Sequence, residues 1–244
     1  MADADAAPPA KAKSDLGTRV LTAVVLLAAA GAALYFGGWI WGVFVAALAA
    51  GALLEWMRIA RAFCSSQGRL ALWTVGGAIY VAIAAAMLIY LRERGWYGPL
   101  LPILTVIATD TGAYFSGRRF GGPKIAPAIS PSKTWSGLIG GMTAAGIVTA
   151  LFAFALSTMV AALAPAPPPL TQGLGAAAIG FVIGAFAAVV AQAGDFFESW
   201  MKRRAGVKDS GKLLPGHGGL LDRVDGLLAV CFVLGVLAML GLRL

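Results

Sequence analysis

Seven long apolar runs constrain this chain more than any other feature of its sequence. A helix needs roughly 20 apolar residues to cross a bilayer, and it satisfies its backbone hydrogen bonds internally. The runs predict an all-α, polytopic integral membrane protein with about seven transmembrane helices. The range is six to nine, because the GGW at residues 37–39 can join or split the first two runs. The predicted spans are 20–37, 39–57, 70–91, 98–117, 135–163, 172–195 and 225–243.

The composition supports this class and bears on the partners. Of the 244 residues, 59% are hydrophobic and 12% are charged, whereas soluble domains are closer to half apolar and a quarter charged. A net charge of +8 is compatible with nucleic-acid binding, but in a membrane protein its commoner cause is an excess of Lys and Arg on the cytoplasmic side. We therefore expect the lipid bilayer, and no nucleic acid, as a partner.

The basic residues indicate the orientation. All of the 19 Lys and Arg residues except Arg92, Arg94 and Arg243 lie before the first predicted span or in every second loop after it. The positive-inside rule places the N-terminus and these loops in the cytoplasm. The sequence thus predicts a disordered cytoplasmic tail (1–18), N-terminal transmembrane helices (19–97) and a transmembrane region with two cytoplasmic loops (98–244).

Two glycine pairs have GxxxG spacing, Gly137 with Gly141 and Gly180 with Gly184. Such pairs let the backbones of two membrane helices approach closely. The spacing does not distinguish contact within the chain from contact across a homodimer, so both interpretations stay open.

Carboxylates are scarce, and most are predicted at the cytoplasmic ends of helices or in adjoining loops. Carboxylates at membrane depth are costly and usually face a wet cavity, a partner or a metal. Asp195 and Glu198 share one face of the helix that leaves the membrane, and Asp222 and Asp225 share one face of the helix that re-enters it. An antiparallel pair of these helix ends can bring Asp195 and Asp222 together. The seven carboxylates in this position are Glu55, Asp110, Asp195, Glu198, Asp209, Asp222 and Asp225.

Two adjacent carboxylates repel unless a proton or a cation lies between them. One interpretation is a salt-bridge network that anchors the basic loop. The other is a site for a hard divalent cation, because Mg²⁺ commonly takes one or two protein carboxylates and completes its shell with water and phosphate oxygens. A cation among many Lys and Arg side chains suits phosphoryl or nucleotidyl transfer.

A second polar set lies in the preceding cytoplasmic loop. Asp110, Tyr114 and Gly117 follow one helix face, and the turn SPSKT (130–134) directly precedes the fifth span. Free N–H groups at a helix N-terminus bind anions, so this turn predicts a phosphate cradle. Ser-Pro and Thr before a helix also form an ordinary cap, and that interpretation stays open.

Two single residues allow opposite interpretations. Glu55 either pairs with Arg58 or belongs to the polar site. His217 lies among three glycines, which let the backbone pass close to a bulky group such as a nucleotide or a phosphate. We interpret His217 as a ligand contact rather than a base, because a phosphate monoester is already largely ionised at neutral pH.

The stretch SWMKRRAGVKDSGKLLPGHGGLLDRVD (199–225) resembles the signature of the phosphatidate cytidylyltransferase family. The sequences GDFFES, DTGAYFSG and SPSKT are similar to other family elements and stand in family order, so the resemblance covers roughly residues 50–244. Two positions depart from the family pattern, since Ser132 replaces a lysine and Ser136 a glutamate. The matching signature positions are Ser199, Lys202, Arg203, Lys208, Asp209, Pro215, His217, Gly218, Gly219, Asp222, Arg223 and Asp225.

The resemblance implies an enzyme of phospholipid biosynthesis that converts CTP and phosphatidic acid to CDP-diacylglycerol and pyrophosphate. It implies the cell (inner) membrane, an active site that faces the cytoplasm, and a catalytic region over 98–244. Mg²⁺, with a second cation such as K⁺, is the expected cofactor, and Asp195 and Asp222 are its expected ligands. Asp195, Asp222, Lys202 and Arg223 are the expected catalytic residues. The expected substrate-binding residues are Asp110, Ser130, Lys133, Thr134, Glu198, Ser199, Arg203, Lys208, Asp209, His217, Gly218, Gly219 and Asp225.

Two other functions compete with this prediction. A CDP-alcohol phosphatidyltransferase also performs Mg²⁺ chemistry at this membrane face, but its D-G-x-x-A-R…D-x-x-x-D pattern is absent from the sequence. A membrane cation or metabolite transporter that uses Asp110 and Asp195 as an ion path needs charges near mid-membrane and broken helices. The charges here cluster near the loops, which favours the enzyme.

Overall fold

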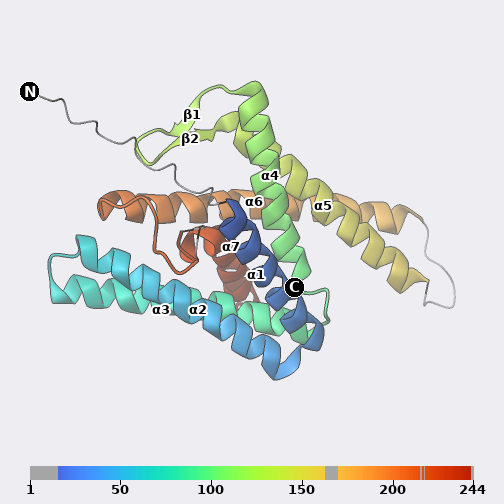
Figure 1. Cartoon of the computed structure of the whole chain (residues 1–244). Coiled ribbons are helices and arrows are strands. Elements are labelled where there is room, and N and C mark those ends of the chain that lie inside the picture. Colours follow the sequence, from blue (N-terminus) through green and yellow to red (C-terminus); the bar gives the residue numbers. More distant parts are fainter. Residues whose placement is uncertain (1–15, 163–169, 215, 217, 243–244) are drawn as a thin grey trace, which may run out of the picture.

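The computed structural model describes residues 16–162, 170–214, 216 and 218–242, which form seven helices and one two-stranded hairpin (Figure 1). His217 and most of the predicted tail lie outside the described residues. Strands β1 (Lys124–Ala126) and β2 (Ser130–Thr134) pair antiparallel. The helices are α1 (Leu16–Phe36), α2 (Gly38–Phe63), α3 (Gln67–Glu93), α4 (Leu100–Phe120), α5 (Trp135–Ala161), α6 (Leu170–Arg204) and α7 (Leu221–Met239).

Five of these helices are long and apolar enough to cross a membrane: α1 from Gly17, α2, α3, α5 and α6. The predicted helical membrane protein is confirmed at this level. Helices α4 and α7 fall short of the same criterion, so seven crossings stay a prediction. The all-α class also missed the hairpin, because a three-residue strand that pairs with SPSKT is too short for an alternating pattern to reveal it.

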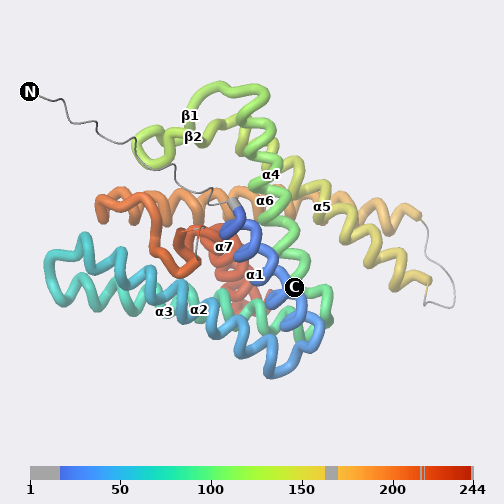
Figure 2. Tube along the Cα trace, viewed as in Figure 1, coloured from blue at the N-terminus to red at the C-terminus, as the bar shows by residue number. Residues whose placement is uncertain are grey.

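Helix α7 occupies the middle of the arrangement. It packs against α3 and α6 and lies between the α2–α3 pair and α6, while α5 runs along α6 and α4 runs along α5 (Figure 2). The β1–β2 hairpin projects from the α4–α5 pair at the end of the bundle where α4 ends and α5 begins (Figure 1).

The GxxxG glycines lie at helix contacts within the chain. A Cβ at Gly141 of α5 would lie 2.9 Å from the Thr109 carbonyl of α4, and one at Gly184 of α6 would lie 2.5 Å from the Ala145 carbonyl of α5. These contacts confirm the intramolecular interpretation of the spacing. The same glycine faces are buried and therefore do not support a dimer contact.

Aromatic packing fixes the end of the bundle that carries the polar residues. The ring of Trp56 in α2 lies 6.1 Å from that of Trp73 in α3 and 5.7 Å from that of Phe197 in α6, and its Nε1 donates to the Trp73 carbonyl at 2.9 Å. Met201 of α6 and Leu221 of α7 are buried in the same core. This packing holds the C-terminal end of α6 beside the N-terminal end of α7.

Candidate active site

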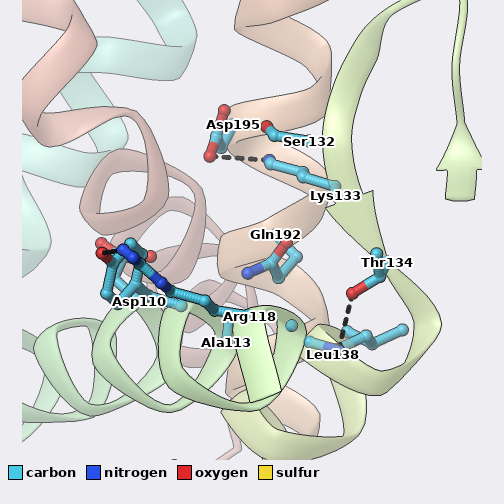
Figure 3. A pocket seen from close by; sticks show the side chains of 12 residues that line it. Asp110, Ala113, Arg118, Ser132, Lys133, Thr134, Leu138, Gln192 and Asp195 are labelled. Carbon is cyan, nitrogen blue, oxygen red and sulfur yellow. Dashed lines mark hydrogen bonds and ion pairs between the residues drawn. The ribbon is translucent and has the colours of Figure 1, made fainter. Parts of the chain in front are cut away.

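A cavity of about 470 Å³ lies between α4, β2, α5 and α6 (Figure 3). Lys133 Nζ of β2 forms an ion pair of 2.6 Å with Asp195 Oδ2 of α6, and Asp110 of α4 lines the same cavity. The sequence assigned these three residues to two separate sets, and the fold brings them together. The lining is Asp110, Ala113, Tyr114, Gly117, Arg118, Ser132, Lys133, Thr134, Gly137, Leu138, Gln192 and Asp195.

The hairpin caps α5 and lines the cavity, while the phosphate cradle stays a prediction. Thr134 is buried, and its Oγ1 accepts a 3.1 Å hydrogen bond from Gly137 N, so this residue is the N-cap of α5. Lys133, which precedes it on the strand, also lines the cavity, where its Nζ pairs with Asp195. Ser130 is buried and lies 3.5 Å from Ser132 through the two hydroxyl oxygens, so it supports the strand without lining the cavity.

Next to this cavity, α6 and α7 place three carboxylates together. Asp195, Glu198 and Asp225 each offer one oxygen, and these oxygens lie within 4.8 Å of one another. Gly194 permits the approach of the helices, because a Cβ there would lie 2.8 Å from the Asp225 carbonyl. Ser199 Oγ donates to Asp195 Oδ1 at 3.3 Å. Oxygen ligands at this separation suit a hard cation.

Lys202 connects this carboxylate group to Asp222. Its Nζ lies 2.6 Å from Glu198 Oε2 and 2.7 Å from Asp222 Oδ1, which confirms the salt-bridge interpretation for these residues. Asp222 also accepts hydrogen bonds from Ser210 N and Gly219 N, at 3.0 and 3.1 Å.

The predicted convergence of the α6 and α7 ends is present in the structure. The α7 carboxylate that groups with Asp195 is Asp225, while Asp222 binds Lys202 and the loop backbone. The assignment of Asp195 and Asp222 as a metal-binding pair therefore stays a prediction, and the structure offers Asp225 and Glu198 as neighbours of Asp195.

Glu55 of α2 binds the loop between α6 and α7. Its side chain is fully buried in α2, and Oε2 accepts from Ser210 Oγ at 3.0 Å and from Leu221 N at 2.8 Å. Of the two sequence interpretations, the structure supports membership of the polar site and not a pair with Arg58. Gly219 is close-packed against this contact, since a Cβ there would overlap Ser210 Oγ.

A second cavity, of about 360 Å³, lies between the end of α2 and this loop. It receives Lys208, Asp209 and Gly218, which the sequence assigned to substrate binding. Arg203 does not line this cavity, and its Nε donates to the Ile129 carbonyl at 3.3 Å. Arg223 does not line it either and is exposed in the first turn of α7. The lining is Arg58, Ile59, Ala62, Ala205, Val207, Lys208, Asp209, Ser210, Gly211, Lys212 and Gly218.

Sequence reasoning missed Gln192 and Arg118, which both line the first cavity. A spacing signal existed for each. Gln192 lies three residues before Asp195 and Arg118 four residues after Tyr114, so each shares a helix face with a residue that had been selected.

A sequence model of the cytidylyltransferase family matches residues 65–240, a range that includes the hairpin, the carboxylate group and the loop. The chain therefore belongs to the cytidylyltransferase family. This result confirms, at the level of the family, the resemblance seen in residues 199–225.

Relatives named phosphatidate cytidylyltransferase define the match further. The chain is 44% identical to the one from Brucella suis biovar 1 (strain 1330) over 165 residues, which cover 66% of this chain and 55% of the relative. It is 32% identical to the one from Rickettsia bellii (strain RML369-C) over 227 residues, which cover 92% of this chain and 91% of the relative. The chain thus spans 55% of the length of the Brucella relative and nearly the whole of the Rickettsia relative.

Proposed function

We propose that this chain transfers the cytidylyl group of CTP to phosphatidic acid, giving CDP-diacylglycerol and pyrophosphate in phospholipid biosynthesis. The observation that carries the proposal is the convergence of Lys133, the α6 carboxylates and the start of α7 at one end of a bundle of membrane-type helices. A diacyl lipid stays in the bilayer and CTP arrives from water, so the two can react only at such an edge.

The reaction requires two phosphate groups of like charge to approach each other. An oxygen of the lipid phosphate attacks the α-phosphorus of CTP, and a P–O bond forms. The bond between the α-phosphorus and the oxygen that bridges to the β-phosphate breaks, and pyrophosphate leaves with that oxygen. Lys133 and Lys202 lie next to the carboxylate group and can offset the charge that the phosphates bring.

Mg²⁺ fits the oxygen donors at the site. Asp195, Glu198 and Asp225 would hold it, because their oxygens lie close enough to share one cation and carboxylates are its preferred protein ligands. When bound, Mg²⁺ neutralises phosphate charge and leaves coordination positions for phosphate oxygens. Asp222 as a further ligand, and a second cation such as K⁺, belong to the same proposal.

The proposed setting is the inner membrane, with seven crossings that include α4 and α7. The N-terminus and the site face the cytoplasm. The distribution of Lys and Arg supports this orientation. A homodimer stays a prediction, and it would need a surface other than the glycine faces of α5 and α6.

The test is a reaction with purified full-length protein in detergent, CTP, Mg²⁺ and phosphatidic acid. We expect equal amounts of pyrophosphate and CDP-diacylglycerol, with activity abolished by Asp195→Asn and retained by Glu93→Gln, an exposed carboxylate at the end of α3. Cation or metabolite flux in liposomes without nucleotide, with no pyrophosphate release in the assay, would favour the transporter instead.

A further inference from the structure

The second cavity differs in charge from the first. Arg58 of α2 and Lys208 and Lys212 of the loop line it, and Asp209 is the one carboxylate among the described lining residues. Three cations thus face one anionic side chain in a space of about 360 Å³. Clusters of basic side chains around a cavity attract polyanions.

The three cations lack protein partners in the described part of the chain. Neither Arg58, Lys208 nor Lys212 forms an ion pair or a side-chain hydrogen bond with any residue that the structure describes. In the first cavity, by contrast, Lys133 is neutralised by Asp195 at 2.6 Å. The second cavity therefore holds positive charge that the described protein residues leave uncompensated.

The second cavity also adjoins the Lys202–Asp222 pair. A Cβ at Gly218 would lie 3.6 Å from Asp222 Oδ2 and 3.8 Å from Asp209 Cβ, and Ser210, another lining residue, donates its N–H to Asp222. Asp222 in turn binds Lys202. One short loop thus lines the basic cavity and holds the Lys202–Asp222 pair.

The position of the loop indicates whether the phosphate that it binds comes from the nucleotide or from the lipid. Residues 205–214 lie beyond Arg204, where the α6 candidate span ends, and Val207, Lys208, Asp209 and Lys212 are exposed. Arg58 lies near the end of the α2 candidate span, which stops at Phe63. A water-borne anion reaches such a loop directly, whereas the phosphate of a diacyl lipid would have to be lifted out of the bilayer.

We infer that the second cavity is the subsite for the triphosphate of the nucleotide, bound by Arg58 and Lys212 together with Lys208. The inference rests on the proposed function and adds a residue that the family match, which begins at residue 65, does not include. Arg58 acts in ground-state binding, so its removal raises KM with little change in kcat.

The experiment compares Arg58→Gln, Lys212→Gln and the double variant with Arg61→Gln, whose arginine lies on the same helix end but does not line the cavity. Each full-length protein is assayed with CTP varied at saturating phosphatidic acid and the reverse. Binding of inorganic tripolyphosphate is measured separately by calorimetry. Because charged hydrogen bonds to phosphate are strong but partly exposed here, we expect KM for CTP to rise about tenfold for each single variant.

Support requires three results: a raised KM for CTP with an unchanged KM for phosphatidic acid, weaker tripolyphosphate binding in the same variants, and recovery of both in Arg58→Lys. A raised KM for phosphatidic acid alone overturns the nucleotide assignment. If the double variant has the same KM for CTP and binds tripolyphosphate as tightly as Arg61→Gln does, the second cavity is not an anion-binding site. If the wild type binds tripolyphosphate through Arg58 and Lys212 but transfers no cytidylyl group, the anion site stands and the proposed function fails.

Discussion

Replacing Glu55 by Ala tests how strongly α2 holds the loop that carries the site. The change removes the acceptor for Ser210 Oγ and Leu221 N, both buried. Hydrogen bonds to a charged group contribute roughly 1.5–3 kcal/mol each. Glu55 Oε1 has no partner among the described residues, so relief of that buried oxygen offsets part of the loss. We expect a net decrease of about 3 kcal/mol in the free energy of unfolding.

Glu55→Gln should lie between wild type and Ala. It keeps one carbonyl oxygen for the two donors but loses the charge, so we expect a loss of about 1 kcal/mol. The assay is thermal unfolding in detergent together with pyrophosphate release, with Glu93→Ala as the matched control. Turnover should fall in the same order, because Ser210 also donates to Asp222. If Glu55→Ala melts and reacts like the wild type, the reasoning about this contact is wrong.

Three other substitutions or treatments have defined outcomes. Lys202→Met should abolish pyrophosphate release and lower the melting temperature, because it leaves Glu198 and Asp222 without their shared cation; unchanged turnover would contradict the role of this lysine. Gly184→Leu should lower the melting temperature far more than Gly175→Leu, because only Gly184 lies against another helix, and equal melting temperatures would contradict the packing described for α5 and α6. Chelation of divalent cations by EDTA should stop the reaction, and added Mg²⁺ should restore it; turnover that persists in EDTA would rule out the proposed cofactor.

The helices could largely be predicted from the sequence, because most of their apolar runs are long enough to cross a membrane. The positions at which the helices end could not be predicted from hydropathy. The sixth predicted span ends at residue 195, whereas helix α6 continues to Arg204. Hydropathy falls there, while the spacing of Asp195, Glu198 and Lys202 still forms a helical face. The polar end of this helix can thus be recognised from the spacing of its charged residues rather than from its hydropathy.

The site was predictable only where its residues are neighbours along the chain. The Glu198–Lys202 pair follows from a separation of four residues. Whether Asp222 or Asp225 joins Asp195 depends on how α7 is rotated against Gly194, and no local pattern reports that rotation. The contacts of Glu55 join residues 155 and 166 positions apart, so spacing gives no indication of them.

The buried carboxylate of α2 has a consequence for protein engineering. It lies upstream of residue 65, where the match to the family model begins, yet it binds the loop beside the candidate site. A fragment trimmed to residues 65–240 would lack this support. A chimera that exchanges the first helices between two relatives should work only if the incoming segment brings its own acidic side chain to the same depth.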